Sequence, residues 1–381
     1  MAENGVEKSL DKKRLKERVR ISLAKQGYTL DKGKITTPEF SDKDAIRSAH
    51  AVAVAYNVQR SRKGLEKHEE RLLNWIANGW EVQPKRFAPR LIEVQRNTEE
   101  ELLFRYARLH WSIPVSAGYG RRVRFLVIDE HNGKLVGILG LGDPVFALKP
   151  RDRWIGWSKE EQRMRLRAVM DAYVLGAVPP YSFLLGGKLI AMLATSNEAR
   201  KAIEKKYRGN KSRIRGEIHD GHIALITTTS ALGRSSIYNR LRFEGRKLFY
   251  SVGYTKGSGD FHFTNGLYND LRRFVEENFQ ATAKHDLWGG GFRNRREVVR
   301  KALVGLGMQA DLTYHGVRRE IFVVPLARNT KEYLQGKQDI LEWHDQPADL
   351  LTEAFIERWF LPRAQRDIRY RDFNRERYRI W

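Results

Sequence analysis

Apolar residues recur at two different spacings along the chain, and the change between them separates a helical first part from a mixed remainder. Residues 10–26, 64–80 and 99–110 place apolar side chains three or four positions apart among charged ones. That spacing predicts amphipathic helices, and the first has a basic face that is either solvated or in contact with a DNA phosphate. We therefore expect a small helical N-terminal domain over residues 1–113.

Strand patterning takes over after Ile113-Pro114. The apolar runs RFLVIDEH and KLVGILGLG flank Asn132-Gly133, and Asp220-Gly221 precedes the run IALITTT. Asn-Gly between apolar runs is the strongest short-range signal for a β-hairpin, and Asp-Gly is a related turn signal. With REIFVVPLA as a late strand, the pattern predicts an α/β core over residues 114–330 and a separate C-terminal segment over residues 331–381.

The stretch Pro179–Phe263 has the order strand, glycine-entered helix, strand, short helix, strand. This order resembles the GCN5-related N-acetyltransferase fold, which implies an α/β (α+β) class with an acetyltransferase-like mixed sheet and flanking helices. The resemblance also implies a general-acid role for Tyr238. At the family's cofactor loop only Gly186 agrees, because Phe183 and Lys188 replace the family's residues. We therefore expect no cofactor.

Charge narrows the class of partner. Seventy Lys and Arg against 46 Asp and Glu give a formal net charge of +24. A balance this basic favours a polyanion, and nucleic acid is the first candidate. No apolar run approaches the roughly 20 residues that cross a bilayer. The chain has no cysteine, which excludes disulfides and thiolate metal sites. We expect a cytoplasmic protein that binds DNA, single-stranded or structured, and no membrane.

Arginines at loop and strand ends are the predicted contacts to nucleic acid. Arg121 and Arg122 stand at the entrance of the first core strand, and Arg234 follows the run IALITTT. Arg151, Asp152, Arg153 and Trp154 are consecutive. Either an Arg–Asp pair caps the helix that starts near Ser158, or Asp152 orients the arginines or acts as an acid or base while Trp154 stacks on a base.

A glycine run and an arginine cluster coincide near residue 290. Gly289, Gly290 and Gly291 precede a predicted helix whose first turn contains Arg293, Arg295 and Arg296. Backbone N–H groups at a helix start and nearby guanidinium groups favour a phosphate. The alternative is a loop with unusual backbone angles followed by a solvated basic face.

From Arg358 to the end, the sequence RWFLPRAQRDIRYRDFNRERYRIW interleaves arginine with aromatic residues. Such a pattern clamps single strands by stacking, but a tail that packs over the core has the same composition. His219 and His222 form an H-x-x-H pattern that flanks a turn, and we expect no metal there.

Several long segments resemble the DruA family of the Druantia anti-phage defence systems. They include LHWSIPVSAGYGRRVRFLV, LGDPVFALKPRDRWIGWS, ALITTTSALGRSSIYNRL and SVGYTKGSGDFHFTNGLY. A shorter relative of this core occurs in transposon-associated proteins, where the Arg151–Trp157 and Gly253–Gly257 runs recur. The resemblance implies defence against phage alongside other subunits of the same system, such as a helicase.

Two classes of function follow from these patterns. The first is a DNA-interacting defence component that grips invading nucleic acid through its basic surface. The alternative is an enzyme that modifies or cleaves nucleic acid with Asp152, Tyr238 and Lys256 as candidate catalytic residues, or, less favoured, a CoA-dependent acyltransferase.

Overall fold

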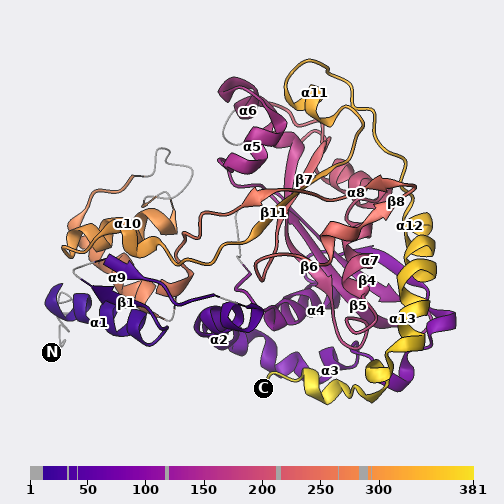
Figure 1. Cartoon of the computed structure of the whole chain (residues 1–381), viewed down its shortest axis with the longest axis horizontal. Coiled ribbons are helices and arrows are strands. Elements are labelled where there is room, and N and C mark those ends of the chain that lie inside the picture. Colours follow the sequence, from indigo (N-terminus) through magenta and orange to yellow (C-terminus); the bar gives the residue numbers. More distant parts are fainter. Residues whose placement is uncertain are drawn as a thin grey trace, which may run out of the picture. The chain divides into compact units, whose positions relative to one another are not determined.

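The computed structural model describes residues 12–31, 34–40, 42–115, 120–211, 216–264, 266–282, 291–292 and 294–381 (Figure 1). The chain divides into two compact units, each assembled from separate stretches of sequence. Unit 1 comprises Met1–Arg60, Ser112–Pro114 and Thr255–Arg318. Unit 2 comprises Ser61–Trp111, Val115–Tyr254 and Arg319–Trp381.

Unit 1 is mainly helical. Its regular elements are α1 (Lys12–Ala24), the short hairpin strands β1 (Thr29–Asp31) and β2 (Lys34–Thr36), most of α2 (Lys43–Leu65), α9 (Leu267–Asn278) and α10 (Arg295–Gly305). The apolar positions of α1 and α10 are buried together, including Leu15, Val19 and Leu303. One apolar core therefore joins the first and last parts of this unit.

Unit 2 is organised around a seven-stranded sheet. Its strand order is β10-β11-β7-β6-β5-β4-β3, and neighbours are antiparallel except for β6 and β7, which are parallel. The bounds are β3 (Pro89–Glu93), β4 (Arg122–Asp129), β5 (Lys134–Gly142), β6 (Val169–Ala177), β7 (Leu225–Thr229), β10 (Tyr250–Tyr254) and β11 (Glu320–Pro325). The predicted mixed sheet is confirmed, as is the β4–β5 hairpin at Asn132-Gly133.

Helices cover both faces of this sheet, as predicted. One apolar cluster joins β4, β5 and β6 to α7 (Gly186–Leu193), α8 (Asn197–Tyr207) and α12 (Ala348–Phe355). A second cluster joins the opposite faces of β4 and β5 to α3 (Glu69–Leu73) and α4 (Glu99–Ala107). The remaining elements of unit 2 are α5 (Lys149–Ile155), α6 (Lys159–Arg165), α11 (Thr330–Leu334), α13 (Leu361–Arg366) and the two-residue strands β8 (Arg242–Phe243) and β9 (Arg246–Lys247).

Two local predictions need correction. The short helix expected from Ser235 to Arg242 is a single 3₁₀ turn over Tyr238–Arg240. Asp220-Gly221 turns the chain, but in the described residues it does not join two strands of a hairpin, because the segment before it forms only an isolated bridge between Lys211 and Ile218. In both places the sequence pattern is local, whereas the conformation follows from packing against distant segments.

The last residues pack onto unit 2 as a strap, defined here as residues 356–381. It begins with a π-helical turn at Ile356–Phe360. Its aromatic rings point inward, since Phe360 is inaccessible to solvent and Tyr370 and Tyr378 are 2% and 3% exposed. Of the two interpretations of this segment, the structure shows the tail packed over the core. Among the described helices, none has the length and apolar content needed to cross a membrane.

Candidate functional site

Among the three predicted catalytic residues, no hydrogen bond or ion pair is found in the described structure. The Asp152 carboxylate, on α5, accepts hydrogen bonds from the Leu148 amide at 2.9 Å and from the guanidinium of Arg151. Tyr238 belongs to the buried core of unit 2, whereas Lys256 is exposed and belongs to unit 1. Asp152 and Tyr238 therefore each have a structural role of their own: Asp152 forms hydrogen bonds around α5, and Tyr238 packs in the core.

Arg151 has a fully buried side chain. Its Nε and Nη2 atoms donate to Asp152 Oδ1 at 2.8 and 2.7 Å. Nη1 donates to the carbonyl of Val145 at 2.8 Å, and Nη2 also donates to the carbonyl of Phe146 at 2.9 Å. The guanidinium therefore holds the loop before α5, and its donors face protein acceptors instead of a phosphate.

Arg121 is also held within unit 2. Its Nε donates to Asp143 at 2.7 Å, and Nη1 donates to the carbonyl of Arg167 at 2.7 Å. Nη2 donates to the carbonyl of Val169 at 3.2 Å, and only 13% of the side chain is exposed. Arg121 thereby fixes the start of β4 to the start of β6.

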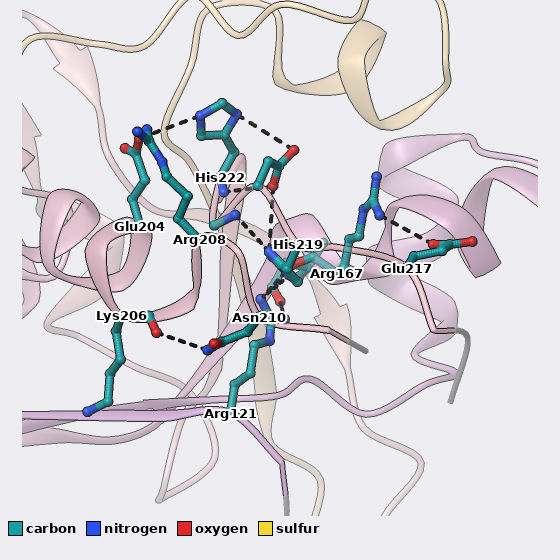
Figure 2. Close-up of polar contacts among 12 residues, drawn as sticks. Arg121, Arg167, Glu204, Lys206, Arg208, Asn210, Glu217, His219 and His222 are labelled. Atoms are coloured by element: carbon teal, nitrogen blue, oxygen red, sulfur yellow. Dashed lines mark hydrogen bonds and ion pairs between the residues drawn. The ribbon is translucent and has the colours of Figure 1, made fainter. Parts of the chain in front are cut away.

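The H-x-x-H histidines lie beside Arg121 in a network of polar contacts (Figure 2). The Nδ1 atom of His219 accepts the amide of Gly221 at 2.8 Å, and its Nε2 lies 3.0 Å from Nη1 of Arg121. Burial is the main cause that lowers the pKa of His219, and Arg121 lowers it further. His222 contacts Glu204 at 3.6 Å. These contacts fasten a loop, and the described residues contain no His, Asp and Glu group suited to a metal ion.

The start of α10 is only partly described, because Gly289, Gly290 and Arg293 lie outside the described residues. Asn294 caps the helix by accepting the amide of Glu297 at 2.9 Å. Arg295 pairs with Asp260 at 2.5 Å and lies 3.9 Å from the Tyr268 ring centre. Arg296 is exposed and donates to Ser258 at 3.0 Å. Arg296 is therefore the described arginine of this turn that can reach an external phosphate.

Other predicted contacts lie on the surface of unit 2. Arg153 and Arg234 are exposed, and no described carboxylate pairs with either. Trp154 is partly buried, with the Lys331 ammonium 4.5 Å from its ring centre. Its indole is therefore already in a cation–π contact. Further exposed cations without a described ion pair lie at Lys149 on α5, the helix that carries Arg153, and at Lys159 and Arg163 on α6.

A cluster that sequence reasoning missed lies where β6 and β7 separate. The two strands pair over only three residues, ending with Asp171 opposite Thr227. The Thr227 hydroxyl donates to the Asp171 carboxylate at 2.8 Å, and the Thr228 hydroxyl donates to the carbonyl of Ala172 at 2.9 Å. Beyond Asp171, side-chain hydroxyls therefore replace the strand-to-strand backbone bonds.

The electrostatics of this cluster are unusual for a carboxylate. Burial raises the pKa of Asp171 from 3.8 to about 6, although Thr227 and the guanidinium groups of Arg319, Arg151 and Arg122 act in the opposite direction. Burial likewise lowers the pKa of Arg319, and Asp171 partly offsets that effect. Desolvation penalises each charged form, so opposite charges gathered in one place compensate each other only in part.

Tyr173 and Tyr238 bring two phenol groups to this region. A register shift in the β5–β6 pairing makes Tyr173 the extra residue of a bulge. Its hydroxyl is buried without a hydrogen-bond partner in the described structure, while Arg122 lies 4.1 Å from its ring centre. Burial raises the pKa of Tyr238 to about 12, with a hydrogen bond to Thr228 acting against the rise. Bulges often re-aim side chains beside functional sites.

Such an arrangement can exchange a proton near neutral pH. A carboxyl group with a pKa of about 6 can accept or donate a proton, and adjacent guanidinium groups can stabilise a developing negative charge. The sequence held one signal for it, a single carboxylate within the apolar strand VMDAYVLGA. That signal cannot identify the partners Thr227, which lies on β7, and Arg319, which directly precedes β11.

The loop compared with acyltransferases has its own arrangement. Lys188, in the first turn of α7, is only 7% exposed. Its ammonium donates to the carbonyl of Ile237 at 3.4 Å and lies 5.2 Å from the ring centre of Trp359. Burial lowers the pKa of Lys188. The side chain that replaces the family's cofactor-loop residue thus turns into the protein.

Comparison with known proteins gives one consistent result. The family model described as "Druantia protein DruA" matches residues 41–336. A protein named Druantia protein DruA from Escherichia coli (strain UMEA 4076-1) is 40% identical over 367 residues, which cover 95% of this chain and 90% of that protein. No solved structure matches.

Proposed function

Because the chain belongs to the DruA family of Druantia proteins, we propose that it acts in Druantia anti-phage defence by binding DNA through its basic surface. Membership of the family indicates the defence system, and the positive charge of the protein indicates DNA as the ligand. The resemblance to defence loci further supports a role beside other subunits, such as a helicase.

The observation that carries this proposal is a set of exposed cations in unit 2 without described carboxylate partners. They are Lys149, Arg153, Lys159, Arg163 and Arg234. Exposed arginine and lysine with no acid partner keep their full attraction for phosphate, whereas paired ones such as Arg165, held by Glu161 and Asp339, do not. The net charge of +24 adds a long-range attraction.

Salt-dependent binding tests the proposal. Each phosphate contact releases about 0.9 counterions from duplex DNA. A variant with Arg153→Ala, Arg163→Ala and Arg234→Ala should therefore bind more weakly and reduce the salt slope by up to about three. Fluorescence anisotropy with single-stranded and duplex DNA, from low to moderate salt, gives both quantities.

A matched variant controls for charge alone. Arg165→Ala, Arg208→Ala and Arg379→Ala remove three arginines of unit 2 that pair with carboxylates, and should leave the salt slope nearly unchanged. If the wild-type protein binds neither DNA form at low salt, the proposed function is wrong.

A second candidate function is an enzymatic one, favoured by the proton-exchanging cluster around Asp171. In this alternative the cluster modifies or cleaves nucleic acid, with Asp171 in the acid or base role and Tyr238 beside it. Single-turnover reactions on phage DNA should then lose activity in Asp171→Asn but keep it in Asp152→Asn, because Asp152 is engaged with Arg151. If the protein binds DNA but catalyses no reaction, the wild type, Asp171→Asn and Asp152→Asn all give no product.

A further inference from the structure

The loop between β5 and α5 exposes two large apolar side chains. Val145 is 60% exposed and Phe146 is 58% exposed. Exposed apolar residues are common singly, but two adjacent ones on one loop form a small apolar projection.

Unit 2 nevertheless holds this loop firmly. The buried guanidinium of Arg151 donates to the carbonyls of both residues, at 2.8 and 2.9 Å. Gln162, on α6, donates to the Phe146 carbonyl as well, at 2.9 Å. Burying a guanidinium is unfavourable unless its donors are satisfied, and here the loop carbonyls and Asp152 accept the hydrogen bonds of Nε, Nη1 and Nη2. The anchor fixes the backbone from which the two side chains project.

The helices that supply these anchors also carry exposed cations. Lys149 and Arg153 lie on α5, and Lys159 and Arg163 lie on α6. Asp152 pairs with Arg151 and Glu161 pairs with Arg165, whereas Glu160, which follows Lys159, is exposed and forms no described ion pair. An apolar projection and unpaired positive charge therefore share one supporting structure.

We propose that Val145 and Phe146 form an apolar wedge that enters duplex DNA between neighbouring base pairs and unstacks them. The wedge rests on the proposed DNA-binding function and specifies its mode. Proteins that kink DNA insert Phe, Leu, Ile, Met or Pro side chains between base steps, while cations hold the phosphates on either side. Arg151 acts here as a positioning residue, since its donors reach the loop carbonyls.

DNA fits this surface better than a protein partner does. Two side chains offer far less apolar area than a stable protein interface, which buries roughly 800 Å² on each partner. Unpaired cations beside the apolar pair would also cost desolvation energy in an apolar protein interface. In an opened base step, the faces of the bases contact the wedge while phosphates on both sides pair with the cations.

A duplex that carries 2-aminopurine at a flexible TA step measures unstacking directly, because this base analogue fluoresces when it leaves the stack. The full-length wild-type protein should bind the duplex and raise its fluorescence. Phe146→Ala should bind about tenfold more weakly and abolish the rise, with an unchanged salt slope, because no phosphate contact is lost. Phe146→Leu should retain most of the signal.

Two variants show that the effect belongs to this loop. Trp80→Ala removes another exposed aromatic side chain of unit 2, which is 75% exposed, and should leave affinity and fluorescence unchanged. Arg151→Lys keeps the charge but loses the planar fork that reaches both carbonyls, so it should lower the fluorescence rise as Phe146→Ala does. Circular dichroism tests whether each variant is folded. If Arg151→Lys does not fold, Phe146→Ala still decides whether the wedge exists.

Several outcomes overturn the wedge. If Phe146→Ala binds the duplex with wild-type affinity and wild-type fluorescence rise, DNA binding stands and the wedge is wrong. If Phe146→Ala retains its DNA signals but loses association with another protein of the defence system, the loop is a protein-docking element. If the wild-type protein binds no DNA, both the wedge and the proposed function are wrong.

Discussion

Inside unit 2, carbonyl oxygens and carboxylates surround the guanidinium groups of Arg121 and Arg151. Guanidinium carries five N–H donors in a fixed geometry, so one residue can fasten several backbone carbonyls at once. From the sequence alone, Arg121 and Arg151 are predicted to contact nucleic acid, as Arg153 is. Only the folded structure separates an arginine that organises a loop from one that remains exposed.

The titration of Asp171 is the clearest expectation at this scale. Its folded-state pKa of about 6 lies above the ordinary 3.8, so the carboxyl group contributes stability below its ordinary pKa and loses that contribution as the pH rises through about 6. Wild-type protein should therefore lose up to about 3 kcal/mol of unfolding free energy relative to Asp171→Asn between about pH 4 and 7.

Urea unfolding of both proteins across this pH range measures the difference. Comparison with the variant removes the titration of all other groups, which the two proteins share. A difference in unfolding free energy that stays constant with pH would mean that Asp171 keeps an ordinary pKa, and the case for proton exchange at the β6–β7 separation would fall with it.

At the scale of the elements, the buried face of a helix was easier to predict from sequence than the residues with which its side chains form ion pairs. The sequence of α10 places apolar residues at helical spacing, and Val299 and Leu303 among them are inaccessible to solvent. The same spacing said nothing of Arg295, whose partner Asp260 comes from a segment before α9. Periodicity reports which face of an element is buried, whereas ion pairs depend on elements that meet only after folding.

The strap and the sheet show the same limit. Alternating arginine and aromatic residues allowed either stacking on bases or packing on the core, and the burial of Phe360 and Tyr370 decides for packing. For the sheet, alternating runs and Asn132-Gly133 predicted strands and one hairpin. They could not place β11 between β10 and β7, because that insertion depends on long-range pairing.

At the scale of the whole molecule, the excess of positive charge is spread over two units that draw on distant parts of the sequence. No sequence signal indicates that residues 255–318 share a core with residues 12–31, yet Leu15 and Leu303 belong to one cluster. The proposed DNA binding can therefore use cations of unit 2 alone or of both units. Affinity alone cannot separate these cases, but the number of phosphates contacted can.

The salt slope counts those phosphates, and α10 offers the test for unit 1. Arg293→Ala with Arg296→Ala should lower the slope by about two if unit 1 contacts DNA, because each lost phosphate contact removes about 0.9. Arg296 is exposed, so its loss should leave the fold intact. Leu303→Asp should instead unfold unit 1, because it puts an unpaired charge into a fully buried position. If the double variant keeps the wild-type affinity and slope while remaining folded, α10 is structural and the phosphate contacts belong to the exposed cations of unit 2.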